Sequence, residues 1–159
     1  MVTHDQNDAF ALGDQVGVML QGELIQWDSS FNLYHAPKSR FVANFIGDGV
    51  FVAGEIISEK TVLTSLGEIC GETINSEHSG QKIDLLIRPD DVKYDPLGSI
   101  YGKVQRKAFK GAQTLYTLAT QSGETLMSLV PSHNDYDIGE VIRVSIDADH
   151  LVCFSREIS

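Results

Sequence analysis

Cationic side chains between residues 103 and 110 form the densest group in this sequence that could bind a ligand. They are Lys103, Arg106, Lys107 and Lys110, with Phe109 among them. A strand that carries cations and an aromatic ring can bind single-stranded nucleic acid, because bases stack on the ring while cations meet the phosphates. The whole chain opposes this chemistry, since 22 acidic residues against 12 basic ones give a formal charge of −10, and an acidic body repels polyanions. We therefore expect a solvated strand face or ion pairs within the protein, and no nucleic-acid partner.

Metal-binding residue types are present but not at the spacing of a metal site. The carboxylates near the chain's centre follow no calcium-loop pattern, and the histidines lie too far apart to pair as ligands. The residues concerned are Glu68, Asp84, Asp90, Asp91, Asp95, His35, His78, His133 and His150. Cys70 and Cys153 form no CxxC motif, so we expect neither a metal site nor a disulfide framework, and a reducing compartment.

The predicted secondary structure changes in type near Gly47. Residues 1–47 predict a mixed α/β segment, in which Gly13, Pro37 and Gly47 are placed to end helices. The expected elements are a helix over 5–12, a hairpin of strands over 15–20 and 23–27, a helix around 31–34 and a helix over 41–46.

The sequence pattern of residues 50–156 predicts strands throughout. The expected strands cover 51–57, 61–65, 83–88, 100–109, 114–120, 124–130, 140–146 and 151–154. Short strands at this spacing, separated by Gly, Pro and Asp turns, favour a small closed or nearly closed barrel. The predicted fold class is therefore mainly β, an OB-like barrel preceded by a short α/β segment.

Several motifs resemble the end of the nucleotide-binding domain of an ABC importer that carries a TOBE-type regulatory domain. Residues 2–6 read VTHDQ, residues 18–26 read VMLQGELIQ, and residues 40–47 read RFVANFIG. Residues 86–92 read LIRPDDV, which is similar to the IRPEDV signature of such regulatory domains. Residues 26–28 and 47–51 look most like the branch that imports ferric iron, while polyamine, sugar and other substrates stay open.

The resemblance implies a division into a remnant of the ATPase domain with its linker helices, residues 1–47, and a TOBE-type β-barrel, residues 48–159. It implies that His4 is the switch histidine, which in the intact parent contacts the γ-phosphate of ATP bound with magnesium. It also implies a homodimer through the barrels, permease subunits as partners, and a cytoplasmic location at the inner membrane.

The sequence has no GxxxxGK[ST] phosphate loop and no LSGGQ-type signature. Backbone N–H groups and the lysine of that loop hold the nucleotide phosphates. We therefore expect the chain to be a C-terminal fragment that neither binds nor hydrolyses ATP, with no cofactor of its own. The alternative from another class is a stand-alone barrel that binds a small ligand or oxyanion near residues 103–110.

Overall fold

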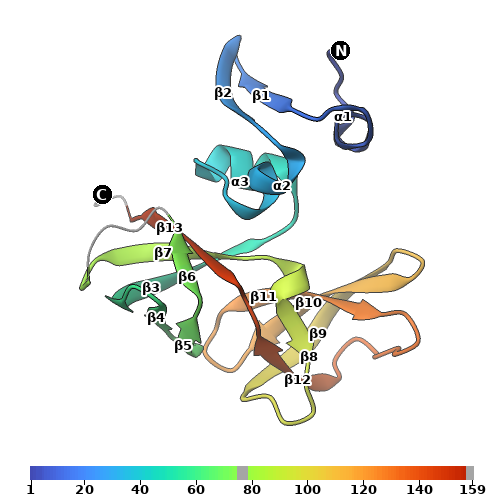
Figure 1. Cartoon of the computed structure of the whole chain (residues 1–159). Coiled ribbons are helices and arrows are strands. Elements are labelled where there is room, and N and C mark those ends of the chain that lie inside the picture. Colours follow the sequence, from blue (N-terminus) through green and yellow to red (C-terminus); the bar gives the residue numbers. More distant parts are fainter. Residues whose placement is uncertain (75–78, 157–159) are drawn as a thin grey trace. The chain divides into compact units, whose positions relative to one another are not determined.

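The computed structural model describes residues 1–74 and 79–156, and His78 lies outside them. The chain divides into two compact units, Met1–Gly47 and Asp48–Ser159 (Figure 1). In the part of the chain that the structure describes, no helix has the length and apolar character needed to cross a membrane.

The first unit contains the predicted hairpin and three short helices. Its elements are α1 (Gln6–Leu12), β1 (Val16–Leu20), β2 (Glu23–Asp28), α2 (Ser30–His35) and α3 (Arg40–Ile46). Each helix begins at a side chain that accepts hydrogen bonds from the first backbone N–H groups, and these caps are Asp5, Ser29 and Ser39. The hairpin turns at Gln21 and Gly22, which both have positive φ.

The first unit has a small core. Its buried apolar cluster is made of five residues from β1, α2 and α3: Val16, Val18, Leu33, Val42 and Ile46. Several large apolar side chains of the same unit stay in solvent, including Met19 at 57%, Leu24 at 55% and Trp27 at 61% exposure. A unit of this size with so few buried residues is marginal in stability.

The second unit is built almost entirely of strands. They are β3 (Val50–Ser58), β4 (Thr61–Thr64), β5 (Gly67–Cys70), β6 (Glu72–Ile74), β7 (Lys82–Ile87), β8 (Val92–Tyr94), β9 (Ile100–Phe109), β10 (Gln113–Thr120), β11 (Thr125–Pro131), β12 (Val141–Ile146) and β13 (His150–Ser155), with a 3-10 turn η1 (Pro89–Asp91) before β8. All eight predicted strands are confirmed. The sequence missed β5, β6 and β8, which have only three or four residues each and are too short to show an alternating pattern.

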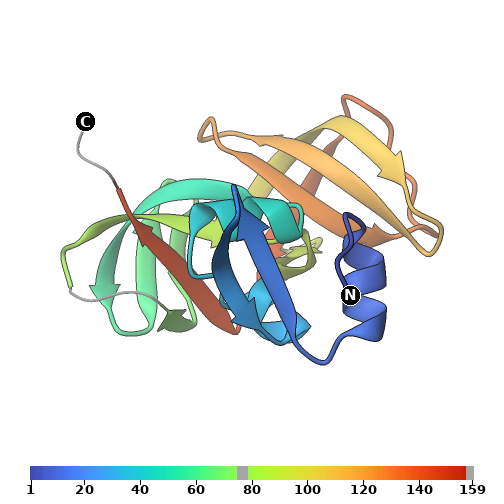
Figure 2. The same cartoon turned by 90° about the horizontal axis from the view of Figure 1, so that it is seen from above.

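The strands form two sheets that share one core. One sheet has the order β11-β10-β9-β12-β8 and the other the order β5-β4-β3-β7-β13-β6. Figure 2 shows both, with residues 100–131 in yellow and orange and residues 50–74 in green. Fully buried residues of both sheets, such as Val52, Leu85, Leu118 and Val144, belong to one continuous cluster.

The five-stranded sheet curls until its first and last strands meet. The buried Ser128 hydroxyl on β11 donates a hydrogen bond to the Val92 carbonyl on β8. Gly102 on β9 permits close packing inside this curl, because a Cβ there would lie 2.9 Å from Leu118 Cβ. The result is a nearly closed barrel, which confirms the predicted fold class.

Candidate functional site

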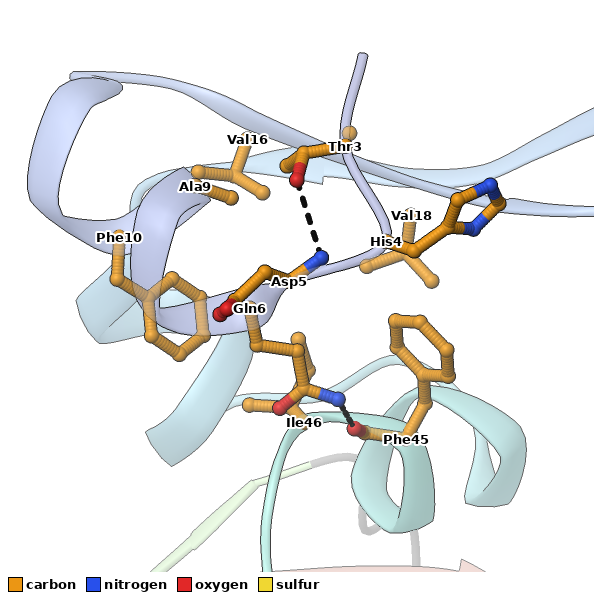
Figure 3. Close-up of a pocket in the computed structure, with 11 residues that line it drawn as sticks. Thr3, His4, Asp5, Gln6, Ala9, Phe10, Val16, Val18, Phe45 and Ile46 are labelled. Carbon is orange, nitrogen blue, oxygen red and sulfur yellow. Dashed lines mark hydrogen bonds between the residues drawn. The ribbon is translucent and has the colours of Figure 1, made fainter.

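The segment around His4 is fixed by its neighbours in the first unit. The Thr3 hydroxyl accepts a hydrogen bond from the Asp5 N–H at 3.0 Å, and the Asp5 carboxylate accepts one from the Asn7 N–H at 2.9 Å. The Gln6 side-chain amide donates to the Phe45 carbonyl at the end of α3 (Figure 3). These bonds hold residues 3–6 against α1 and α3.

A small pocket lies beside this segment. Its volume is about 50 Å³, and its walls come from residues 3–6 and from Ala9, Phe10, Val16, Gly17, Val18, Phe45 and Ile46. Sites for drug-sized ligands have volumes of roughly 300–1,000 Å³. The pocket therefore has room for a few water molecules and not for a nucleotide.

His4 itself is exposed to solvent. Figure 3 shows its imidazole pointing away from Asp5 and Gln6, at the margin of the pocket. Its neighbours Thr3, Asp5 and Gln6 make hydrogen bonds within the first unit, and the side chain of His4 lies at the exposed surface of this segment. An exposed imidazole can donate a hydrogen bond to an anion that approaches it.

The structure divides the predicted basic cluster into two pairs. Lys107 is paired with Asp135 at 3.0 Å and donates to the Tyr136 carbonyl, and hydrogen bonding to Asp135 raises the pKa of the Lys107 amine. Lys110 lies 3.8 Å from the Asp48 carboxylate. The expectation of ion pairs within the protein is therefore confirmed for these two residues.

Lys103 and Arg106 lie instead on the outer face of the five-stranded sheet. Lys103 stands opposite Val141 on β12 and Ala119 on β10, and Arg106 stands opposite Thr117 on β10. Two further cations share this face, Arg143 on β12 and Lys93 on β8. Sequence reasoning missed them because each comes from another strand, and only the pairing of β8, β12 and β9 brings them together.

The carboxylates considered as metal ligands are dispersed. Asp84 pairs with Arg156 at 3.3 Å, and Asp95 accepts a hydrogen bond from the Leu97 N–H within a turn. Among residues 1–74 and 79–156, no three His, Cys, Asp or Glu side chains gather as they would around a metal ion. Cys70 is exposed and Cys153 is buried, both as free thiols, and burial raises the pKa of the Cys153 thiol to about 11.

Asp91 has an unusual environment that the sequence did not reveal. Burial, then the nearby charge of Asp90, raises the pKa of the Asp91 carboxyl to about 6. Lys93 opposes this shift, and Asp149 and Asp147 add smaller contributions that raise the pKa. The chain passes between the two sheets here twice, at η1 and between β12 and β13, and the Asp147 N–H donates to the Asp91 carbonyl at 2.8 Å. The two crossings therefore bring carboxylates together that are distant in sequence.

Comparison with known protein families identifies the class of the barrel. Residues 85–154 match the TOBE domain. This range begins in β7 and includes all five strands of the curled sheet together with most of β13. The second unit thus contains a TOBE domain, as the IRPEDV-like motif indicated.

Relatives extend the similarity to the first unit. The chain is 34% identical over 162 residues to the spermidine/putrescine import ATP-binding protein PotA of Mesomycoplasma hyopneumoniae, an alignment that covers 98% of this chain and 34% of the relative. It is 30% identical over 170 residues to the protein of the same name from Pseudomonas aeruginosa, covering 95% of this chain and 47% of the relative. The chain is thus homologous to ATP-binding subunits of ABC importers and spans about a third to a half of their length.

A solved structure has a similar fold. The cytoplasmic molybdate-binding protein ModG, in a form with molybdate bound, superposes with a TM-score of 0.56 at 15% sequence identity, over 67% of this chain and 96% of ModG. At this identity the similarity concerns the fold alone. It agrees with the OB-like, TOBE-type barrel of the second unit.

Proposed function

We propose that this chain acts as the regulatory and dimerisation region of the ATP-hydrolysing subunit of an ABC importer. The observation that carries the proposal is the homology over 98% of the chain to a subunit of this kind, because it includes the α/β unit as well as the TOBE barrel. In that setting the subunit works at the cytoplasmic side of the inner membrane, bound to permease subunits. The alternative of a stand-alone oxyanion-binding barrel is not favoured, since such a barrel would not need residues 1–47.

For the transported substrate we propose a polyamine such as spermidine or putrescine. The relatives from both Mesomycoplasma hyopneumoniae and Pseudomonas aeruginosa carry spermidine and putrescine in their names. The expectation of ferric iron, which was based on residues 26–28 and 47–51, has no support from these relatives. The polyamine proposal replaces it.

His4 is the residue we propose for catalysis in the complete ATPase. Its outward-facing ring, on a segment that Thr3, Asp5 and Gln6 hold in place, suits a group that contacts the γ-phosphate of a nucleotide bound elsewhere. ATP and magnesium would be held by a phosphate loop, which these 159 residues do not contain. This chain alone would therefore show no ATP turnover and no melting shift with ATP and magnesium.

A chimeric transporter tests the proposal. The part of the Pseudomonas aeruginosa relative that aligns with this chain is replaced by residues 1–159, and the chimera is produced with the permease of that relative. We expect spermidine uptake and ATP turnover to be restored, and His4→Ala to abolish turnover while ATP binding persists. A folded, ATP-binding chimera that supports no uptake of spermidine would contradict the proposed function.

The mass of the isolated chain in solution tests dimerisation. We propose that two barrels associate about a twofold axis, where one self-complementary patch is sufficient. Light scattering should then give twice the chain mass of 17.5 kDa. A single species of 17.5 kDa at micromolar concentration would refute association through the barrels.

A further inference from the structure

The five-stranded sheet of the barrel is free of acidic residues. None of β8, β9, β10, β11 and β12 contains an Asp or Glu, although the chain has 22 of them. The other sheet of the same unit has carboxylates in its strands, among them Glu55, Glu68 and Asp84. Charge is therefore separated between the two sheets of one barrel.

Cations gather on the outer face of this acid-free sheet. Along β9, buried residues alternate with exposed ones, so that Tyr101 and Lys103 point outward while Gly102 and Val104 point into the core. Register then places Arg143 on the same face as Tyr101, since the two stand directly opposite each other. Lys93 lies on this face because it stands opposite Ser145 on β12. Arg106 lies on it because it stands opposite Thr117 on β10. We call these four residues, Lys93, Lys103, Arg106 and Arg143, the basic face.

Within the described residues, no carboxylate forms an ion pair with a member of the basic face, whereas Lys107, Lys110 and Arg156 each have one. Lys93, Lys103 and Arg106 are exposed to solvent. Three cations of this unit are thus neutralised in part by a carboxylate, and the four cations of the basic face are not among them.

Arg143 is held in a fixed orientation by its neighbours. Its Nε donates to the Gly98 carbonyl at 2.8 Å, and its guanidinium lies 5.0 Å from the centre of the Tyr101 ring. Only glycine fits at position 98, because a Cβ there would lie 2.4 Å from the Val144 carbonyl oxygen. A guanidinium that is already oriented loses little entropy when its remaining N–H groups meet a carboxylate in a fork.

We infer that the basic face is a docking surface for an acidic segment of a partner protein. Charge complementarity favours a carboxylate-rich partner over neutral ones. Screening favours a short peptide segment over a nucleic acid or a membrane. At physiological salt, charges are screened beyond about 8 Å, so each part of a partner interacts only with the charges of the chain that are close to it. A short segment is affected by the four local cations, while an extended polyanion also meets the acidic remainder of a chain with a charge of −10.

The test is fluorescence anisotropy with a short labelled poly-glutamate peptide at low salt, using the whole chain. We expect saturable binding, and a loss of about tenfold or more in affinity for the double variant K103Q/R106Q. The matched control K60Q/K82Q removes two exposed lysines, one from the turn between β3 and β4 and one from β7, and should stay within about twofold of the original affinity. R143K keeps the charge but loses the fork, and it should weaken binding while circular dichroism shows that the chain is still folded.

Three results would overturn the inference. The first is no saturable binding of poly-glutamate by the folded chain at low salt. The second is an equal loss of affinity in K103Q/R106Q and in K60Q/K82Q, which would mean that the total charge of the chain, and not the basic face, determines binding of the peptide. The third is tighter binding of a single-stranded oligothymidylate, or of vesicles containing phosphatidylglycerol, than of poly-glutamate.

Discussion

Replacing Asp91 by Asn should stabilise the barrel unit at neutral pH. Burial and the neighbouring carboxylates raise the pKa of Asp91 from 3.8 to about 6, so the folded chain disfavours the charged form. Above about pH 6 the carboxylate is ionised in both the folded and unfolded chain, and its electrostatic cost reduces the free energy of unfolding. Asn has nearly the same shape and carries no charge, so the variant avoids this cost.

The magnitude follows from the difference between the two pKa values. A shift from 3.8 to about 6 corresponds to at most about 3 kcal/mol, at about 1.4 kcal/mol per pKa unit. Because the carboxyl group is partly exposed, solvent screens the repulsion, and we expect roughly 1 kcal/mol. For a unit of this size that corresponds to a rise of about 3–5 °C in Tm.

The sign of this change in stability can be checked by varying the pH. Between about pH 4 and pH 6 the folded chain binds a proton at Asp91 that the unfolded chain does not bind, so the contribution of this residue to stability increases as the pH falls. The advantage of Asp91→Asn over the original chain should therefore be largest above about pH 6.5 and vanish near pH 4.

Urea unfolding followed by circular dichroism over this pH range measures the effect. Glu68→Gln is the matched control, since it removes one exposed carboxylate from the same unit. An Asp91→Asn chain that is less stable than the original at neutral pH, or whose advantage does not change with pH, would refute the reasoning.

Three further predictions concern stability. Ser128→Ala removes the buried hydroxyl that bonds to the Val92 carbonyl and leaves that carbonyl unsatisfied, so urea unfolding should show a loss of about 1–2 kcal/mol. Tyr116→Phe removes a hydroxyl that donates to the Asn134 carbonyl at 3.3 Å and accepts from the Tyr136 N–H at 3.1 Å. The rate of amide hydrogen exchange should therefore rise in residues 132–138. An unchanged rate would contradict the role of this hydroxyl in holding the loop. The single tryptophan, Trp27, lies in the first unit, so on heating its fluorescence transition should precede the loss of the β signal in circular dichroism, and coincident transitions would show that the units unfold together.

Much of the fold could be predicted from local signals. The caps Asp5, Ser29 and Ser39 and the stops at Gly13 and Gly47 define the helices of the first unit, because capping depends on residues close in sequence. The longer strands were also predictable from their apolar content. The closure of the five-stranded sheet was not predictable. The hydrogen bond from Ser128 to Val92 joins residues 36 positions apart, and no local pattern encodes such a contact.

The candidate sites illustrate the same limit. The stretch from Lys103 to Lys110 looked like one basic cluster in the sequence, but Lys107 and Lys110 pair with Asp135 and Asp48. The basic face instead combines Lys103 and Arg106 with residues from β8 and β12. Similarly, Asp91 acquires its raised pKa partly from Asp147 and Asp149, which reach it only because the chain crosses between the sheets twice.

The separation of charge within the barrel connects these observations. Carboxylates that crowd at the crossings around Asp91 lower the stability of the folded chain, and of the basic face Lys93 offsets part of that cost by its attraction for the Asp91 carboxylate. Folding alone would favour placing the cations beside the carboxylates, as Lys107 and Lys110 do. Among the described residues, Lys103, Arg106 and Arg143 form no ion pair with a carboxylate, although the chain has 22 acidic residues. These cations are therefore available to a partner outside the fold, and the peptide-binding experiment tests that interaction directly.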